Sequence, residues 1–485
     1  MLVPHSDNQP QMTDIHSRGA QDGVPRTPAS RHASPPAEAG SHLRECPGCG
    51  LFQRVPVLAR GNAANCPRCN AVLRRHIVQP QSRALALALT GLLLFALATQ
   101  MPFVDMRVQG QSLQTTLFSG PVQLERHGMW ELSIVVLITT LGAPLGKLLA
   151  MVWVLIGLRM RRPPQYLYVV FRWVEKLSPW SMVEVFLLGV FVAYTKLVDL
   201  AQVDVGGAVY ALGALMMVMA AADSVLDREG IWDALEARGI TARNAGAIPA
   251  DAIPEPELPL SDGQSFDRTA DDAARLIGCD TCGLVSRRPP TSGIRHCLRC
   301  GGRLHHRKPN SLARTAALAV TAAVLYIPAN MLPVLTFTWF GRGAPSTILG
   351  GVLELAAAGM WPLALLVFIA SVTVPVLKLS GLAWLLISTR LAERGRLVER
   401  TRLYRIVDSI GRWSMVDVFM ISILTALVRL GAVASVQPGS GVLSFCAVVI
   451  LTIFAAMSFD PRLMWDAASR SFESEPAPNM TVSRP

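Results

Sequence analysis

The feature that most constrains this chain is an internal duplication, in which each half repeats the same order of motifs. Two Cys-x-x-Cys pairs precede a long apolar region in the first half, and two more precede another in the second half. The copies align at an offset of 231 to 233 residues. A period this long indicates two duplicated domains, and not the short units of a solenoid. The matched positions beyond the cysteines are Trp130 with Trp361, Pro144 with Pro375, Lys147 with Lys378, Trp180 with Trp413, Glu184 with Asp417, and Trp232-Asp233 with Trp465-Asp466.

The apolar regions are long enough to cross a bilayer. The chain is 51% hydrophobic and 16% charged, with a mean hydropathy of +0.38, whereas about 25% charged residues is usual for a soluble protein. A helix needs roughly 20 apolar residues to span a membrane. We predict spans at Arg83–Val104, Trp130–Leu158, Pro179–Leu200, Gly206–Leu226, Ser311–Leu335, Met360–Ser388, Trp413–Val433 and Gly441–Ser458. The predicted fold class is an α-helical integral membrane protein with two tandem four-helix transmembrane units, each preceded by a small cytoplasmic zinc-ribbon-like module.

The distribution of Lys and Arg predicts the orientation. The connections 159–176 and 390–412 hold five and seven of these residues, whereas the opposite connections 105–129 and 336–359 hold two and one. The positive-inside rule therefore places the first pair in the cytoplasm. Four spans per unit return both cysteine modules and both termini to the same side. This placement explains the net charge of +11 better than nucleic-acid binding does.

Composition suggests the remaining boundaries. The N-terminal segment is polar and has no apolar core of a signal peptide, so we expect a disordered tail. The linker is rich in proline and acidic residues, and we expect an extended spacer. The predicted domains are a tail at 1–41, module 1 at 42–76, transmembrane unit 1 at 83–226, the linker at 227–275, module 2 at 276–306, transmembrane unit 2 at 311–458 and a cytoplasmic tail at 459–485.

Each module carries a metal-ligand pattern. The spacings are C-x2-C-x16-C-x2-C and C-x2-C-x14-C-x2-C. Two facing Cys-x-x-Cys turns supply the tetrahedral sulfur shell that Zn²⁺ prefers, and Gly48, Gly50 and Gly283 suit the left-handed turns that wrap sulfur around a metal. We predict two Zn²⁺ ions, with iron as the less favoured alternative. The expected ligands are Cys46, Cys49, Cys66, Cys69, Cys279, Cys282, Cys297 and Cys300.

Thiol redox chemistry is the competing interpretation of these cysteines. It is weakened by the predicted cytoplasmic location and by the division of eight cysteines into two four-ligand sets. The ninth cysteine, Cys446, lies in the last predicted span and is expected to be a small buried apolar residue.

Polar residues within the predicted spans of the second unit suggest a site. A charge in the bilayer costs about 2.5–3.5 kcal/mol on insertion scales, and a charged residue within a span therefore suggests a structural or functional role. Lys378 lies seven residues after Ser371, which is two helical turns, and Pro375 between them favours a kink. Lys378 and Asp417 have opposite charge on adjacent spans and are the expected partners of each other. The predicted pocket consists of Lys378, Asp417, Ser371, Ser414 and Thr452.

Two alternatives stay open for this pocket. The ion pair can be purely structural, or Lys378 can snorkel to the cytoplasmic interface. The first unit has a related but incomplete polar set, because Met219 stands where Thr452 aligns. The second unit is therefore the better candidate for the unit that contains the functional polar pocket. The secondary polar set of the first unit is Lys147, Glu184, Ser181 and Thr140.

Several of these motifs together resemble a known family. They are the paired cysteine knuckles, Gly128-Met-Trp130 and Gly359-Met-Trp361, the Pro-x-x-Lys pairs, Trp-Ser-Met-Val-[Glu/Asp]-Val-Phe at 180–186 and 413–419, and Ser458-Phe-Asp-Pro-Arg-Leu-Met-Trp-Asp466. Over roughly residues 42–470 the chain resembles the paraquat-inducible protein A family, which has PqiA-like and LetA-like members. The sequence leaves the subtype open.

The resemblance implies a function. It suggests a component of a lipid transport system in the bacterial inner membrane, which passes phospholipid to or from a periplasmic tunnel formed by an MCE-domain protein of the PqiB or LetB type. It also implies that Ser371, Lys378, Ser414, Asp417 and Thr452 form the family's polar network. No Gly-x4-Gly-Lys-[Ser/Thr] motif occurs, so we expect neither ATP hydrolysis nor another enzymatic activity. The alternatives are a membrane thiol or quinone oxidoreductase and a passive scaffold for the MCE partner.

Overall fold

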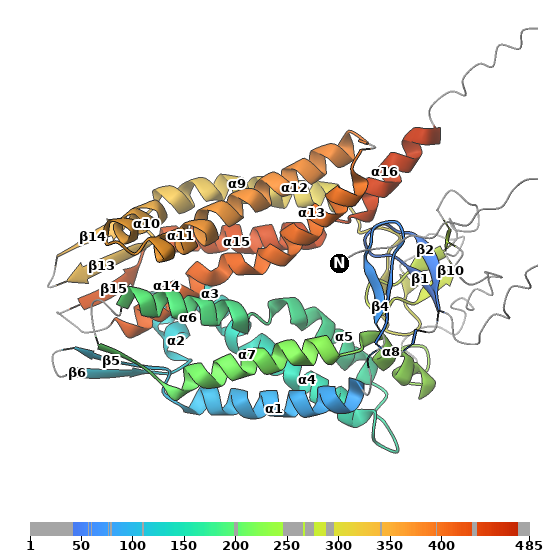
Figure 1. Ribbon diagram of the computed structural model, residues 1–485, viewed down its shortest axis with the longest axis horizontal. Helices are drawn as coiled ribbons and strands as arrows, with labels where there is room; N and C mark the ends of the chain where they lie inside the picture. The colour runs from blue at the N-terminus through green and yellow to red at the C-terminus, as the bar shows by residue number, and fades with distance from the viewer. Residues whose placement is uncertain are drawn as a thin grey trace, which may run out of the picture. The chain divides into compact units, whose positions relative to one another are not determined.

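The computed structural model describes residues 42–473, except for 57, 60, 76, 78–79, 109–110, 198–201, 246–264, 267–275, 288–294, 340–341, 394 and 429–433. Within this part of the chain, eight helical segments are long and apolar enough to span a membrane. They are Pro80–Gln100, Trp130–Gly157, Leu167–Thr195, Gly207–Val225, Ser311–Met331, Trp361–Arg390, Leu397–Leu427 and Gly441–Ser458. They form two helical bundles of four segments each, which confirms the predicted fold class (Figure 1).

The two bundles have the same order of elements. The first contains α1 (Pro80–Gln100), α3 (Trp130–Leu137), η1 (Ile138–Gly142), α4 (Ala143–Gly157), α5 (Leu167–Leu177), η2 (Ser178–Trp180), α6 (Val183–Leu197) and α7 (Gly207–Val225). The second contains α9 (Ser311–Met331), α11 (Trp361–Phe368), η4 (Ile369–Thr373), α12 (Val374–Arg390), α13 (Leu397–Ile410), η5 (Gly411–Met415), α14 (Val416–Leu427) and α15 (Gly441–Ser458).

A π-helical turn interrupts the second segment of each bundle. These turns, η1 and η4, lie directly before Pro144 and Pro375. Proline lacks a backbone N–H and cannot donate to the carbonyl four residues earlier, which disturbs the regular helix at this point. The irregular turn is the observed form of the kink that the sequence predicted at Pro375.

The third segment of each bundle is longer than the sequence indicated. Residues 159–176 and 390–412 were predicted as connecting loops, but helices α5 and α13 occupy most of them. In α5, the buried side chains Leu167, Tyr168, Phe171 and Val174 recur along one face, while Arg172 and Lys176 lie between or after them. The clustered cations therefore belong to amphipathic helices whose apolar faces pack on the bundles.

Small β-sheets cover one end of the bundles, which we call the sheet end. The expected hairpin after the first span forms strands β5 (Val104–Val108) and β6 (Gln111–Thr115), and its counterpart forms β13 (Leu335–Trp339) and β14 (Arg342–Ser346). Each hairpin pairs with a further strand that the sequence did not predict, namely β7 (Gln202–Val205) with β5 and β15 (Ala434–Pro438) with β13. Short helices α2 (Ser119–Arg126) and α10 (Ile348–Ala357) follow the hairpins.

The cysteine modules lie at the opposite end, which we call the module end (Figure 1). Each module consists of two antiparallel hairpins, and each hairpin carries one Cys-x-x-Cys pair in its turn. Module 1 has β1 (His42–Glu45) with β2 (Phe52–Val55) and β3 (Ala63–Asn65) with β4 (Val72–Arg75). Module 2 has β9 (Leu276–Gly278) with β10 (Val285–Arg287) and β11 (Arg295–His296) with β12 (Arg303–Leu304).

Two predicted connecting regions contain folded elements. Within the linker predicted at 227–275, helix α8 (Arg228–Ala237) buries Trp232, and β8 (Ser265–Phe266) pairs with β2. In the tail predicted at 459–485, helix α16 (Arg462–Glu473) buries Trp465. The Trp-Asp pairs repeated in the sequence lie on these two helices and anchor them. The predicted tail at 1–41 lies outside the described residues.

Helices α6 and α14 form the contact between the bundles within the apolar zone. All twelve residues of α14 are buried. The approach is close because Gly189 of α6 has no side chain: a Cβ there would lie 2.9 Å from Phe419 Cβ and 3.2 Å from the Val416 carbonyl oxygen. Helix α2 also packs on α14, since a Cβ on Gly120 would lie 2.5 Å from the Ser422 hydroxyl oxygen. Small residues at such contacts are typical of helix association in membranes.

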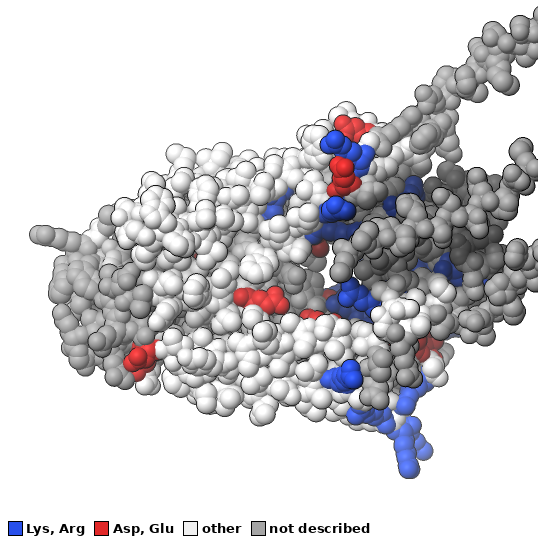
Figure 2. Space-filling model, viewed as in Figure 1, with Lys and Arg blue, Asp and Glu red and all other residues white. Residues whose placement is uncertain are grey.

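Charge is distributed as a membrane protein requires. On the face that Figure 2 shows, the visible Lys and Arg side chains lie toward the module end, and the surface of the bundles is almost entirely uncharged. The large apolar side chains exposed on the helices, such as Leu93, Val320 and Leu377, suit contact with lipid.

The Gly189 contact can be tested with a matched pair of substitutions. We expect Gly189→Ala to destabilise the chain by about 1–3 kcal/mol, because the added methyl group overpacks the α6–α14 contact. Gly213→Ala is the control, since its Cβ would approach only Leu187 Cδ2, at 4.0 Å, and alanine is favoured over glycine in a helix. Thermal unfolding of the two purified variants measures the difference. Equal melting temperatures would show that α6 and α14 do not meet at Gly189.

Candidate metal centres and polar pocket

The eight predicted ligand cysteines form two buried sets of four. In each set, the four sulfur atoms all lie within 4.8 Å of one another. The closest Sγ–Sγ distances are 3.5 Å for Cys46–Cys69, 3.6 Å for Cys49–Cys66, 3.5 Å for Cys279–Cys300 and 3.4 Å for Cys282–Cys297. Four thiolates bound at 2.3 Å to one tetrahedral ion would be about 3.8 Å apart. The residues therefore fit a four-sulfur metal site, and such an ion would stabilise the fold of each module.

Every Cys-x-x-Cys turn is closed in the same way. A residue with positive φ follows the second cysteine, and its backbone N–H donates to the carbonyl of the first cysteine. These residues are Gly50, Asn70, Gly283 and Gly301. The sequence correctly indicated Gly50 and Gly283, but Gly48 does not have a positive φ. Gly48 is instead needed for close packing, because a Cβ there would lie 3.0 Å from the Arg405 guanidinium and 3.3 Å from Cys69 Sγ.

Module 1 docks on the second bundle. Arg405 of α13 donates to both the carbonyl oxygen and the sulfur of Cys69, each at 3.3 Å. The Arg68 guanidinium lies 4.4 Å from the centre of the Trp465 ring, a cation–π arrangement. The buried cysteines of module 1 share an apolar cluster with Leu385, Leu386, Phe459, Met464 and Trp465.

Module 2 docks on the first bundle in the equivalent way. Arg172 of α5, the counterpart of Arg405, donates to the Cys300 carbonyl oxygen at 3.3 Å. Arg299 pairs with Asp233 and Glu236 of α8 at 2.5 and 2.8 Å. The buried cysteines of module 2 belong to the cluster that contains Tyr168, Phe171 and Trp232. The modules therefore cross over, and each metal site contacts the bundle of the other half.

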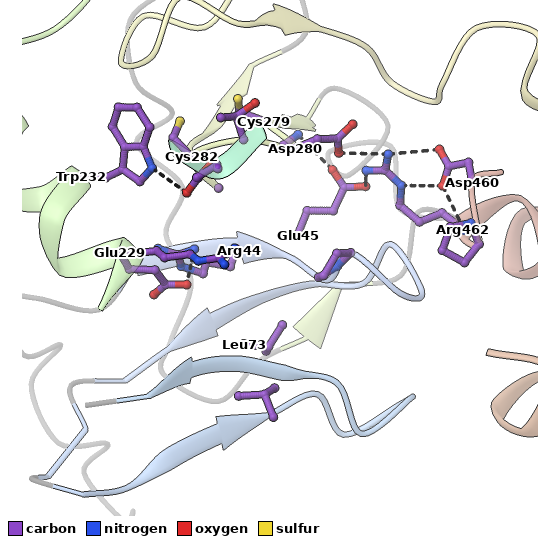
Figure 3. Close-up of a pocket in the computed structure, with 18 of the residues that line it drawn as sticks. Arg44, Glu45, Leu73, Glu229, Trp232, Cys279, Asp280, Cys282, Asp460 and Arg462 are labelled. Carbon is purple, nitrogen blue, oxygen red and sulfur yellow. Dashed lines mark hydrogen bonds and ion pairs between the residues drawn. The ribbon is translucent and has the colours of Figure 1, made fainter. Parts of the chain in front are cut away.

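Ion pairs hold the modules to each other and to α8 and α16 around a cavity of about 500 Å³ at the module end (Figure 3). Arg44 pairs with Glu229 at 2.6 Å. Glu45 of module 1 accepts from the Gly278 backbone N–H of module 2 at 3.0 Å and also pairs with Arg462 at 3.3 Å. Because carboxylates and guanidinium groups alternate along the wall, charge on one element is neutralised by another.

Burial changes the ionisation of several acidic groups in this wall, and Glu229 and Asp460 show the two opposite outcomes. Burial raises the pKa of Glu229 to about 7, although the positive charges of Arg44 and Arg74 oppose the shift. Burial also acts on Asp460, but hydrogen bonds from Arg462 and its charge outweigh this effect and hold the Asp460 pKa below its usual range. Glu229 is therefore a wall carboxylate that titrates near neutral pH.

Within the second bundle, the structure joins Lys378 to Thr452. The Lys378 side chain is 1% exposed, and its ammonium donates to the Thr452 hydroxyl oxygen at 2.7 Å and to the Gly411 carbonyl oxygen at 3.3 Å. Lys378 thus bonds neutral oxygens, and not the Asp417 carboxylate that the sequence suggested as its partner. Gly411 follows the last residue of α13, where the helix dipole favours a cation. The side chain does not snorkel, because it is fully enclosed between helices.

Two other predicted pocket residues line a cavity whose wall does not include Lys378 or Thr452. Ser371 and Asp417 line a small cavity of about 40 Å³ together with Met420 and Phe445. Such a volume holds a water molecule or two, and not a phospholipid headgroup. The buried Ser414 lies between Gly411 and Asp417 in sequence, and its hydroxyl has no hydrogen-bond partner among the described residues. The Ser371 hydroxyl donates to the Val367 carbonyl oxygen at 2.7 Å.

In the first bundle, the buried lysine forms an ion pair. Lys147, the counterpart of Lys378, pairs with Asp223 of α7 at 2.7 Å. The predicted set is otherwise dispersed: Glu184 is exposed, and the Thr140 hydroxyl donates to the Val136 carbonyl oxygen at 2.6 Å. Ser181 is buried with its hydroxyl unpartnered in the described structure.

Asp223 is the residue that sequence reasoning missed. It is an acidic residue near the end of an apolar span and lies one helical turn after Met219, so the signal was present. Its counterpart in the second unit is Ala456. Among the described residues, no carboxylate is recorded within ion-pair distance of Lys378, and the acidic group whose charge acts on this lysine is the more distant Asp408 of α13.

Comparison with known proteins agrees with this architecture. The sequence profile of the paraquat-inducible protein A family matches residues 81–236 and 312–469, which together cover more than half of the chain. The chain belongs to this family. The two matched segments are the two bundles with α8 and α16, so the profile spans both halves of the duplication.

Several relatives in the family are similar over nearly their whole length. The intermembrane transport protein PqiA of Escherichia coli K12 is 35% identical over 440 residues, covering 90% of this chain and 98% of that protein. The lipophilic envelope-spanning tunnel protein A of the same organism is 29% identical, covering 87% and 91%. A probable intermembrane transport protein of Haemophilus influenzae is 22% identical, covering 91% and 99%. No solved structure matches the chain significantly.

The metal sites can be tested by elemental analysis. We expect two metal ions per chain, one for each cysteine set. Cys46→Ser is expected to reduce the content to about one and to lower the melting temperature, because module 1 loses the ion that stabilises it. Cys446→Ser is the control, since Cys446 is buried in α15 as an apolar residue, as predicted. Unchanged metal content in Cys46→Ser would overturn the assignment.

The ionisation of Glu229 predicts a pH dependence. Its pKa is about 7 in the folded protein and near 4.5 in an ordinary environment, so the folded state binds more protons between these values and stability falls as pH rises through them. Arg44 and Arg74 face this carboxylate, and Asp227 and Asp233 lie nearby.

We expect Glu229→Gln to flatten this part of the profile, because glutamine does not ionise. Melting temperatures of both proteins between pH 5 and 8 measure the difference. Parallel profiles would contradict the raised Glu229 pKa.

Proposed function

We propose that this protein is a component of the bacterial inner membrane that transfers phospholipid between the bilayer and a periplasmic tunnel formed by an MCE-domain protein of the PqiB or LetB type. The names of the relatives, which refer to intermembrane transport and to an envelope-spanning tunnel, support this function. The eight membrane-length helices and the absence of a nucleotide-binding Gly-x4-Gly-Lys-[Ser/Thr] motif from the sequence are consistent with a transporter that is not itself an ATPase.

The observation that carries the proposal is the difference between the two lysines. Lys147 is neutralised by Asp223 at 2.7 Å. Lys378 is buried at the equivalent position, where its hydrogen bonds go to the neutral oxygens of Thr452 and Gly411. Burial of a charge in the apolar zone is costly. The second lysine is therefore suited to a transient anionic partner, and the phosphate of a phospholipid is the anion that the surrounding membrane supplies.

The orientation follows from the charges. The positive-inside rule places the module end, with α5 and α13, in the cytoplasm and the sheet end in the periplasm. The N- and C-termini and both cysteine modules are then cytoplasmic, where Zn²⁺ is the ion that we propose for the two sites. The sheets β5–β6–β7 and β13–β14–β15 would face the tunnel partner.

Lipid entry requires the second bundle to open, because the cavity beside Asp417 is only about 40 Å³. Helix α10 is the element best suited to move. Its first turn lines this cavity through Thr347, Ile348 and Gly351, and no atom lies within 4 Å of the position of a Cβ on Gly351. Its counterpart α2 is instead held against α14 through Gly120. Opening at α10 would expose Ser371 and Asp417 first.

The lysine pocket can be tested with paired variants. We expect Lys378→Met to reduce co-purifying phospholipid and complementation of outer-membrane integrity about tenfold or more, which corresponds to about 1.4 kcal/mol. Asp417→Asn is expected to reduce transport without loss of metal. Lys147→Met with Asp223→Leu, which removes the pair of the first unit, is the control and should retain transport. Mass spectrometry of bound lipids and a detergent-sensitivity assay provide the readouts.

Two outcomes would contradict the proposed function. Full complementation by both Lys378→Met and Asp417→Asn, with normal assembly on the MCE partner, would indicate a passive scaffold. Reactive thiols in the purified protein, together with activity lost in cysteine variants that keep their metal, would favour an oxidoreductase.

A further inference from the structure

A second cavity lies at the module end of the second bundle, apart from the Lys378 pocket and from the cavity between the modules. It has a volume of about 630 Å³ and lies between the end of α12 and the start of α13. It is lined by Trp384, Glu393, Gly395, Arg396, Glu399, Arg400 and Leu403. This volume is in the range of small-molecule sites, which is about 300–1,000 Å³.

Arg400 is the chemically unusual residue of this cavity. It is 4% exposed, and only one of its guanidinium nitrogens has a hydrogen bond, from Nη1 to the Glu393 carbonyl oxygen at 2.7 Å. The Nε and Nη2 atoms are buried without a partner among the described residues. A buried donor left unpaired costs about 1–3 kcal/mol, and more when it is charged. These two nitrogens form one edge of the guanidinium fork, which matches two oxygens of a phosphate.

The cavity is also lined by the carboxylates of Glu393, whose charge acts on Arg400, and Glu399, but the start of α13 and Arg396 favour an anion. Helix α13 begins at Leu397 without a side-chain cap, so the first backbone N–H groups of α13 remain available and the helix dipole favours negative charge there. Arg396 provides a second guanidinium, and its pair with Glu399 at 3.7 Å is exposed and therefore weak. An incoming phosphate can replace Glu399 as the partner of Arg396.

The remaining lining points to a lipid rather than a soluble anion. Trp384 is 54% exposed and lies on α12, six residues before Arg390, which is about 9 Å along the helix axis. Tryptophan at this depth is typical of the interface between acyl chains and headgroups. Leu403 completes an apolar wall beside the two arginines.

In the described part of the first bundle, an apolar side chain fills the equivalent position. The counterpart of Arg400 is Leu167, which is fully buried. Trp384 does have an exposed counterpart, Trp153, so the buried arginine is what distinguishes the second unit. Leu167 fills the space next to Gly157, where a Cβ would lie 2.6 Å from a Leu167 methyl carbon. The charged cavity is thus specific to the second unit.

We propose that this cavity binds the phosphate of an anionic phospholipid headgroup, with the edge of Arg400 as the principal donor and Trp384 against the glycerol and the upper acyl chain. The site is distinct from the Lys378 pocket. Its occupancy does not depend on whether the protein transports lipid.

Native mass spectrometry of the full chain in detergent micelles tests the proposal. Phosphatidylglycerol, phosphatidylcholine and inorganic phosphate are titrated separately into wild type, Arg400→Gln and Arg402→Gln. Arg402 is exposed on the same helix and does not line the cavity, so it controls for loss of one charge. We expect Arg400→Gln to weaken phosphatidylglycerol binding about tenfold or more, and Arg402→Gln to change it less than about twofold.

The Arg400→Lys variant shows whether weaker binding in Arg400→Gln results from a folding defect. It keeps the charge but loses the fork, so we expect an intermediate loss of binding with an unchanged melting temperature. Lys378→Met should retain binding at this site, which separates it from the transport pocket. Equal affinity of wild type for phosphatidylglycerol and phosphatidylcholine, or equal loss in the Arg400→Gln and Arg402→Gln variants, would overturn the proposal. If millimolar inorganic phosphate displaced phosphatidylglycerol completely, the site would be assigned to free phosphate, and the lipid assignment would be overturned.

Discussion

The rest of the architecture depends on the four sulfur atoms that join the two short hairpins of each module. They hold the hairpins together as one unit, and this unit docks on a helical bundle. A module of about 35 residues cannot bury enough apolar surface to fold alone, so it needs both a central ion and a surface to dock on. Each module finds its surface on the bundle of the other half. Arg405 holds the Cys69 carbonyl from the second bundle, and Arg172 holds the Cys300 carbonyl from the first. The crossover ties the bundles together at one end, while α6 and α14 join them within the apolar zone.

This symmetric frame makes the differences between the halves meaningful. Lys147 and Lys378 are at equivalent positions, yet in the described structure only Lys147 forms a direct ion pair, with Asp223 at 2.7 Å. The same contrast recurs at the sheet end, where Gly120 is packed against Ser422, whereas a Cβ on its counterpart Gly351 would meet no neighbouring element within 4 Å. It recurs again at the module end, where Leu167 is buried and its counterpart Arg400 lines a cavity. In all three places the first half is filled or charge-paired. The second half has a polar group without an ion pair, or open space, at the equivalent position.

The sequence allowed prediction of those features that local patterns encode. Cysteine spacing predicted both four-sulfur sets, and hydropathy predicted eight spans. The sequence does not reveal β7 and β15 because each pairs with a strand roughly 100 residues earlier, and a short strand after a helix has little signal of its own. Helices α5 and α13 were taken for loops because their cations obscured the spacing of the apolar face. The hydrogen-bond partner of Lys378 could not be predicted because the turns η4 and η5 do not have the period of a regular helix. Side chains beyond these turns therefore point in directions that the regular helical period does not give.

The irregular turns suggest how the closed pocket could open for the proposed phospholipid. A π-helical turn and a 3-10 turn have weaker hydrogen-bond geometry than a regular helix, and in the second bundle they flank the polar residues on two sides. Ser371 belongs to η4, while Gly411 and Ser414 belong to η5. A small rotation at either turn would separate Lys378 from the Gly411 carbonyl without breaking a regular helix. The same turns in the first bundle are restrained by the Lys147–Asp223 ion pair, which has no equivalent at Ala456. We therefore expect movement to cost least in the second half, where the recorded hydrogen bonds of the buried lysine go to neutral oxygens, and this is the half that holds the proposed transport site.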